Sequence, residues 1–123
     1  GVDRDELGVV GDQIGCPTYA QDIARCVVEL SDYFEQEDFE SQIFHYCGDQ
    51  PCSWYQFAQA IFSCAAHQGL TTPAVLKSIT TEQYPTAAPR PAYSVMDCRK
   101  LSSKFQIPPS DWRAAISGVI VRL

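Results

Sequence analysis

Positive charge and long apolar runs are both scarce in this sequence. Among its 123 residues, nine are lysine or arginine and fifteen are aspartate or glutamate, which gives a net charge of −6. Because the nine cations are scattered, no basic patch could cover a phosphate backbone, and we expect no nucleic-acid partner. The longest mostly apolar runs, Ile23 to Leu30 and Ala114 to Leu123, are too short and too interrupted to span a bilayer. We therefore expect no membrane partner.

Paired cysteine motifs are also missing, although six cysteines are present. The absence of any C-x-x-C pair argues against a zinc site. Cys26 and Cys64 fall on apolar faces of expected helices and Cys47 in an apolar segment, where a free thiol acts as a small hydrophobic group. We expect reduced thiols and a cytoplasmic protein. Gly1 is not methionine and no signal peptide follows it, as expected of a fragment of a longer protein or of a processed terminus.

The sequence lacks the common catalytic motifs as well. The nearest approach to a dinucleotide-binding G-x-G-x-x-G is formed by Gly8, Gly11 and Gly15, whose spacing differs. None of the six tyrosines has a lysine four residues later, so the Tyr-x-x-x-Lys pair of short-chain reductases is absent. Serine nucleophile elbows, H-E-x-x-H and phosphate-loop patterns are missing too. The sequence therefore predicts no catalytic and no cofactor-binding residue in this chain.

Hydrophobic periodicity predicts alternating strands and helices. Strands are expected at Leu7 to Val10, Ile43 to Cys47 and Val75 to Thr80. The second of these is apolar on both faces, as in a strand buried between parallel neighbours. The pattern is that of an α/β protein with too few strands for a complete doubly wound sheet. We expect an incomplete parallel sheet with flanking helices, and the missing strands would belong to an upstream segment.

Four helices are expected, and each begins after a capping residue. The first covers Tyr19 to Phe34 behind Thr18, and the second begins after Ser53 in a capping-box pattern. Trp54 and Phe57 fall on the apolar face of the second helix, and for both we favour core packing over ligand stacking. The N-caps expected for the remaining two helices are Asp97 and Ser110.

Two loops carry groups suited to an anion. The loop from Asp12 to Thr18 places polar side chains, a glycine and a proline before a helix N-terminus, where free N–H groups attract negative charge. An ordinary helix entry explains this loop equally well. The other loop holds Arg90 between two prolines, and a guanidinium on a stiff loop suits a diphosphate. On spacing alone, a surface salt bridge is favoured for Arg90.

These loops also carry a family resemblance. Residues 12–18, DQIGCPT, resemble the D-Q-x-G-x-P-T segment of dTDP-4-dehydrorhamnose reductases. Residues 44–48 followed by 53–58 resemble the last parallel strand of that family and the helix after it. Residues 90–101 are similar to the family stretch R-P-x-x-S-x-L-D-x-x-K-L, with Met96 in place of the usual leucine. The resemblance covers nearly the whole chain, in order.

The resemblance implies the C-terminal, substrate-binding part of a Rossmann-like extended short-chain dehydrogenase/reductase. Residues 1–123 would form the sugar-nucleotide-binding portion, and the N-terminal dinucleotide-binding portion would be absent from this chain. The complete enzyme would reduce the 4-keto group of dTDP-6-deoxy-L-lyxo-4-hexulose with NADPH or NADH, giving dTDP-L-rhamnose. Because the catalytic tyrosine, its lysine and a Ser or Thr lie upstream in this family, the fragment itself is expected to be inactive.

Carried over to this chain, the resemblance implies that Gln13, Gly15, Pro17 and Thr18 shape the pocket and that Arg90 faces the diphosphate. Magnesium is associated with some members, but no ligand for it is assigned here. The expected partner is the dTDP-sugar, together with self-association through apolar surfaces that lose their cover. Two alternatives stay open: a non-catalytic relative such as the regulatory subunit of methionine adenosyltransferase, and another sugar-nucleotide epimerase or dehydratase.

Overall fold

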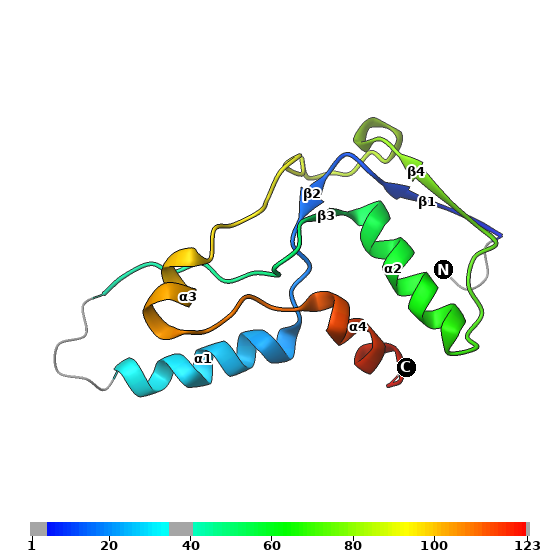
Figure 1. The fold of residues 1–123 in the computed structure, drawn as a ribbon. Helices are drawn as coiled ribbons and strands as arrows, with labels where there is room; N and C mark the ends of the chain where they lie inside the picture. Colours follow the sequence, from blue (N-terminus) through cyan, green and yellow to red (C-terminus); the bar gives the residue numbers. More distant parts are fainter. Residues whose placement is uncertain (1–4, 35–40, 123) are drawn as a thin grey trace.

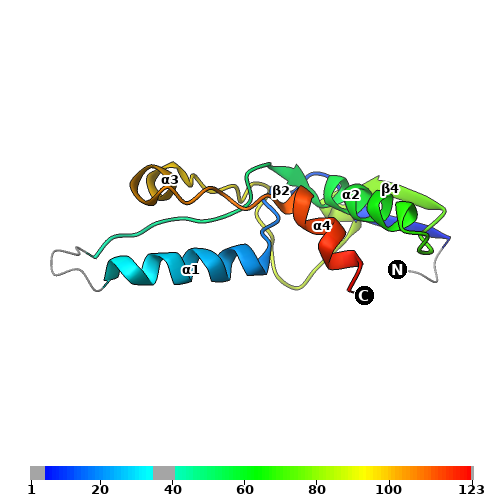
Figure 2. The ribbon, with the colours of Figure 1, turned by 60° about the horizontal axis from the view of Figure 1, so that its bottom comes forward.

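The computed structural model describes residues 5–34 and 41–122, which form two lobes that meet at a narrow centre (Figure 1). One lobe contains α1 (Ala20–Phe34) and α3 (Arg99–Phe105). The other contains α2 (Trp54–His67), α4 (Trp112–Ile120) and the strands β1 (Glu6–Val10) and β4 (Val75–Ile79). The view in Figure 2 shows that the two lobes make an elongated molecule rather than a sphere.

Two strands and the helix that lies between them in the chain form one part of the second lobe, and α4 packs against that helix. β1 (Glu6–Val10) and β4 (Val75–Ile79) form a parallel pair in which Glu6 lies opposite Val75 and Val10 opposite Ile79. Parallel strands need a long crossover connection, and its last element here is α2 (Trp54–His67), which contacts both strands. The strands predicted near 7–10 and 75–80 are confirmed.

The start of α2 is fixed by a capping box, as the sequence predicted. The Ser53 hydroxyl accepts a hydrogen bond from the Gln56 N–H at 3.1 Å, and the Gln56 side chain accepts one from the Ser53 N–H at 2.9 Å. The helix ends next to Gly69, whose φ of 76° is left-handed. Ser53 also belongs to β3 (Cys52–Ser53), which pairs antiparallel with β2 (Ile14–Gly15). The cap, the strand pair and the helix therefore hold one another in place.

Each lobe has a small core of its own. Between α2 and α4 (Trp112–Ile120), the Trp112 side chain is only 2% exposed and meets the Phe57 ring edge-on at a centroid distance of 5.3 Å. Between α1 and α3, the residues buried together are Cys26, Leu101, Phe105 and Ile107. Aromatic rings of Tyr33 and Phe44 lie against Phe105 at the edge of this second core.

A buried serine connects the lobes at the centre. Ser110 is 1% exposed, and its hydroxyl accepts from the Tyr19 N–H at 3.1 Å and donates to Asp22 at 2.7 Å. Its backbone forms a bridge with Gly48. A Cβ on Gly48 would lie 2.1 Å from the Pro17 carbonyl oxygen, so only glycine lets the chain segments approach this closely.

The strand expected at Ile43 to Cys47 is not formed. Residues 41–47 belong to no strand, and Ile43 is 77% exposed. The physical reason is that a buried parallel strand needs neighbours on both edges, and the described part of the chain places none there. Ile23 and Val27 on α1 are also more than 40% exposed, so the expected self-association stays a prediction with apolar surface available to it.

Two of the expected caps, Thr18 and Ser110, are wrong because their hydroxyls bond elsewhere, and a third cap lies one residue from its expected place. The Thr18 hydroxyl donates to a backbone carbonyl and accepts from the Gly48 N–H. The cap position of α3 is Cys98, whereas the hydrogen bond from the Arg99 N–H at the start of the helix goes to the carboxylate of Asp97, one residue earlier. The cap of α4 is Asp111, whose carboxylate accepts from a backbone N–H three residues later, since the Ser110 hydroxyl is used at the centre.

All six cysteines are free thiols, as predicted. The sulfur atoms of Cys47 and Cys98 lie 3.5 Å apart in the buried interior. Burial raises the pKa of Cys98 to about 11, and burial together with the neighbouring Cys47 raises the pKa of Cys16 to about 12. Cys16 and Cys98 therefore stay protonated at neutral pH and act as small apolar groups.

Candidate functional site

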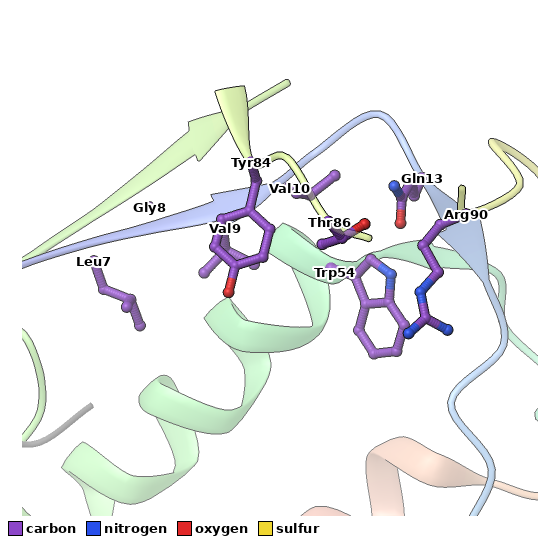
Figure 3. Close-up of a pocket in the computed structure, with 9 residues that line it drawn as sticks. All are labelled: Leu7, Gly8, Val9, Val10, Gln13, Trp54, Tyr84, Thr86 and Arg90. Carbon is purple, nitrogen blue, oxygen red and sulfur yellow. The ribbon is translucent and has the colours of Figure 1, made fainter. Parts of the chain in front are cut away.

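A pocket of about 600 Å³ lies where β1, the first turn of α2 and the segment after β4 meet (Figure 3). This volume falls within the range of sites that hold a small ligand. β1 supplies an apolar wall, and the remaining lining residues come from four other places along the chain. These residues are Gln13, Trp54, Tyr84, Thr86 and Arg90.

Arg90 brings an uncompensated positive charge to this pocket. It lies in the irregular stretch between Pro89 and Pro91, and its side chain is exposed. Within residues 5–34 and 41–122 its guanidinium forms no ion pair and no hydrogen bond, so the salt bridge favoured from its spacing is not formed there. In Figure 3 the guanidinium extends into the pocket beside the Trp54 ring. Its hydrogen-bond donors are therefore available to an anion.

Gln13 lies at the same end of the pocket as Arg90 in Figure 3, and Thr81 holds its side chain there. Its side chain is 9% exposed, and Nε2 donates to the Thr81 hydroxyl oxygen at 3.1 Å. The adjacent Asp12 carboxylate accepts from the Thr81 N–H at 3.0 and 3.1 Å and from its hydroxyl at 2.8 Å. Thr81 starts the 3₁₀ turn Thr81–Gln83, which leads directly to Tyr84. The Asp12–Gln13 pair thus positions the pocket wall that follows β4.

The short strand β2 ties three pocket segments together. Ile14 pairs with Ser53, next to Trp54, and its N–H donates to the Ala92 carbonyl at 2.8 Å, next to the Arg90 loop. The neighbouring Gly15 lies close to Ser94, because a Cβ there would be 2.9 Å from the Ser94 hydroxyl oxygen. Gly15 therefore allows close packing behind the pocket rather than lining it.

Pro17 and Thr18 lie at a different hollow. They border an apolar cavity of about 290 Å³ between the start of α1, α2 and α4. The structure thus brings Gln13 and Arg90 into one pocket and places Pro17 and Thr18 outside it. At the start of α1 the Asp22 carboxylate already bonds Ser110 and pairs with Arg25 at 3.1 Å. The positive end of that helix therefore faces a carboxylate of its own chain.

Two aromatic residues of the pocket were missed by the sequence analysis. Trp54 is 57% exposed and Tyr84 is 58% exposed. Core packing was expected for Trp54 and Phe57; it is confirmed for Phe57, which packs against the core around Trp112, and wrong for Trp54. Trp54 is the first residue of α2 and lies on the pocket wall rather than under α4. Trp54 and Phe57 lie three residues apart on the same face of α2, so hydrophobic periodicity does not distinguish the exposed position from the buried one.

The described residues do not fit a nicotinamide dinucleotide or a metal ion. Gly8 lies in β1 and Gly15 ends β2, and α1 begins only at Ala20, so these glycines do not lead directly into a helix N-terminus that could hold a pyrophosphate. Across 5–34 and 41–122, no three His, Cys, Asp or Glu side chains form a group that could hold a metal. No helix in this part of the chain combines the length and apolarity needed to cross a membrane.

The Asp12–Thr81 contact gives a titration that can be measured. The pKa of Asp12 is lowered, first by the Thr81 N–H and then by its hydroxyl. The ionised form therefore stabilises the folded loop above the pKa of the unfolded chain, and this stabilisation is lost as the pH falls through the lower folded pKa. We expect Thr81→Val, which removes only the hydroxyl, to raise the Asp12 midpoint part of the way to the usual value in a carboxyl ¹³C NMR titration.

Asp97 is the internal control for this titration. Its pKa is lowered to about 2 by hydrogen bonds from Arg99, which are remote from Thr81. The Asp97 midpoint is therefore expected to be the same in Thr81→Val and in the unmodified chain. If the pKa of Asp12 is the same in Thr81→Val as in the unmodified chain, the assigned contact between Asp12 and Thr81 is contradicted.

Comparison with known proteins gives one consistent group. The family model described as the RmlD substrate binding domain matches residues 1–123. The dTDP-4-dehydrorhamnose reductase of Aggregatibacter actinomycetemcomitans is 43% identical over 118 residues, which cover 94% of this chain and 40% of that protein. The crystal structure of a dTDP-4-dehydrorhamnose reductase from Clostridium acetobutylicum superposes with a TM-score of 0.80 at 31% identity, covering 98% of this chain and 40% of that one.

A second solved structure adds a bound cofactor. The dTDP-4-dehydrorhamnose reductase from Bacillus anthracis, solved in complex with NADP, has a TM-score of 0.73 and 29% identity, and it too is covered to 40%. The fold of this chain is therefore the α/β fold of one part of these proteins. The chain spans about two fifths of the length of the relatives that it matches.

Proposed function

Because the chain belongs to the family of RmlD substrate-binding domains, we propose that it forms the sugar-nucleotide-binding part of a dTDP-4-dehydrorhamnose reductase. The observation that carries this proposal is the Arg90 guanidinium, which has no partner among residues 5–34 and 41–122 and lies in a pocket of about 600 Å³ that also contains Gln13. A forked cation on a proline-bounded segment suits the two phosphates of a nucleotide-sugar, because it forms paired hydrogen bonds and loses little entropy on binding.

In this proposal the substrate residues have different tasks. Arg90 binds the diphosphate, and Gln13 lies at the same end of the pocket with the rest of its amide available to the substrate. Gly15, Pro17 and Thr18 support the pocket from behind: Gly15 through β2, and Thr18 through its bonds to Cys16 and Gly48. Arg90 and Gln13 thus bind and orient the substrate, the other three residues support the chain segments around the pocket, and none of the five transfers a proton or a hydride.

The reaction belongs to a longer protein that contains this chain. That protein reduces the 4-keto group of dTDP-6-deoxy-L-lyxo-4-hexulose to give dTDP-L-rhamnose, in the cytoplasm. The NADP bound to the relative from Bacillus anthracis supports NADPH as the reductant. The dinucleotide-binding portion and the proton donor then lie outside residues 1–123, since the described residues fit neither.

Binding to the 123-residue chain tests the substrate assignment. We expect dTDP to bind more tightly than thymidine or inorganic pyrophosphate alone, because it engages both ends of the pocket, and we expect NADPH not to bind. Isothermal titration calorimetry with the four compounds measures this order. Absence of dTDP binding would overturn the proposal.

A rate measurement completes the test. The longer protein is expected to oxidise NADPH only when the keto sugar nucleotide is present, and the isolated chain is expected to show no turnover. The loss of NADPH absorbance measures the reaction rate for both the longer protein and the isolated chain. Turnover by the isolated chain would show that the chemistry was assigned to the wrong part.

A further inference from the structure

The pocket has an aromatic wall that the proposed diphosphate contact does not use. Trp54 and Tyr84 leave more than half of their side-chain surface uncovered, at 57% and 58% exposed, and both line the same pocket as Arg90. The other tryptophan, Trp112, is 2% exposed. Apolar ring surface of this size left in water inside a concave site is typical of ligand-binding surfaces.

The backbone that carries the Trp54 ring is anchored before any ligand arrives. Its backbone follows Ser53 directly, and Ser53 is held by its pairing with Ile14 and by the capping box with Gln56. The Arg90 segment is linked to the same strand through the hydrogen bond between Ile14 and Ala92. The chain segments that carry the indole and the guanidinium are therefore held next to each other by one short strand, which reduces the entropy lost on binding.

We propose that Trp54 is the stacking platform for the thymine base of the bound nucleotide-sugar. Figure 3 shows the indole lying next to the Arg90 guanidinium, with Tyr84 farther along the wall over Val9. In a nucleoside diphosphate one deoxyribose separates the base from the phosphates, so a base stacked on Trp54 places its diphosphate within reach of Arg90. This inference rests on the proposed function and adds the location of the base to it.

The chemistry of the wall favours the base over the hexulose. Beyond Trp54 the pocket is bordered by the apolar side chains Leu7, Val9 and Val10 of β1. A hexulose placed there would leave its hydroxyl groups without partners, which is unfavourable in a desolvated site. Thymine is flat and carries a methyl group, and any nucleic-acid base can stack on an aromatic side chain through its π face. The base therefore fits this end of the pocket, and the sugar lies beyond Arg90.

Three probes separate the base contact from the phosphate contact. We expect Trp54→Ala to weaken binding of dTDP and thymidine about 5- to 100-fold, because base stacking is lost. Binding of inorganic pyrophosphate is expected to change less than twofold. Trp54→Phe, which keeps a ring, is expected to retain most of the affinity. Calorimetry on the same chain measures all three probes.

Fluorescence supplies a readout that a structural role would not change. dTDP is expected to quench the emission of the exposed Trp54, and the quenching is expected to disappear in Trp54→Phe, because Trp112 is buried away from the pocket. Quenching that persists in Trp54→Phe would overturn the stacking assignment.

The outcomes distinguish this inference from the function on which it rests. If Trp54→Ala weakens pyrophosphate as much as dTDP, or leaves thymidine binding unchanged, the base does not stack on Trp54, while the nucleotide site itself stands. If Trp54→Ala weakens the dTDP-sugar but not dTDP, the hexulose occupies the wall and the inference is wrong. If the unmodified chain binds none of the probes, the proposed function is overturned together with it.

Discussion

Replacement of Arg90 by alanine is expected to weaken dTDP binding about 10- to 100-fold. A hydrogen bond to a charged group contributes about 1.5–3 kcal/mol net, and about 1.4 kcal/mol corresponds to a tenfold change in affinity. The guanidinium bonds no other residue within 5–34 and 41–122, so its removal takes no contact away from the described fold. The loss is therefore expected in the dissociation constant for dTDP, measured by calorimetry, and not in the stability of the chain.

Arg90→Lys is the matched control, because it keeps the charge but loses the planar fork. We expect it to bind dTDP with an affinity between those of the unmodified chain and Arg90→Ala. Thymidine, which carries no phosphate, is expected to bind all three proteins equally. If Arg90→Ala binds dTDP as tightly as the unmodified chain, Arg90 does not contact the diphosphate and the pocket assignment fails.

Local sequence signals predicted the elements whose determinants are local. The capping box at Ser53 and Gln56 fixed the start of α2 within one residue, because both partners lie within one helical turn. The strand β1 followed from a short segment bounded by a loop, and β4 followed from the alternation expected of a half-exposed strand. In each case the residues that determine the element are close neighbours in the chain, so the local sequence pattern is enough to predict it.

The elements that failed depend on partners far away or outside the described residues. Ile43 to Cys47 has the composition of a buried strand, but composition cannot supply the neighbouring strands that would complete a ladder. Ser110 looks like a helix cap, yet its hydroxyl bonds Tyr19 and Asp22 across the centre of the molecule. A side chain with two possible uses takes the one that tertiary structure offers, and sequence spacing does not show that choice.

Only part of the candidate site was predicted, because its contacts also join residues that are distant in the sequence. Residue types singled out the loops of Gln13 and Arg90 separately, and only the family resemblance implied that both serve one pocket. The structure brings both to one pocket through contacts of Ile14, which lies in a two-residue strand without a detectable pattern. The role of Asp12 in holding Thr81 was missed, because the two are distant in the sequence. Trp54 was expected in the core because it shares a helix face with Phe57. Spacing does not show that the first residue of α2 lies on the pocket wall rather than under α4.

The largest effect on stability is expected from Trp112→Ala, at about 3–5 kcal/mol. Trp112 is 2% exposed, packs edge-on against Phe57 and donates from Nε1 to the Gln50 carbonyl at 2.9 Å. Alanine would leave a cavity between α2 and α4 and an unpaired carbonyl beside it. Because a domain of this size has a total stability of about 5–15 kcal/mol, urea unfolding is expected to show a much lower midpoint or a chain that no longer folds.

The two tryptophans make this measurement a test of the whole assignment. Trp54→Ala removes the same side chain from an exposed position, and we expect it to change the free energy of unfolding by less than about 0.5 kcal/mol. Trp112→Phe keeps a ring in the core and is expected to cost less than Trp112→Ala. If Trp54→Ala destabilises the chain as much as Trp112→Ala, Trp54 serves the fold, and a loss of nucleotide binding in that variant could no longer be assigned to stacking. A stable Trp54→Ala with weakened dTDP binding assigns one tryptophan to the fold and the other to the ligand.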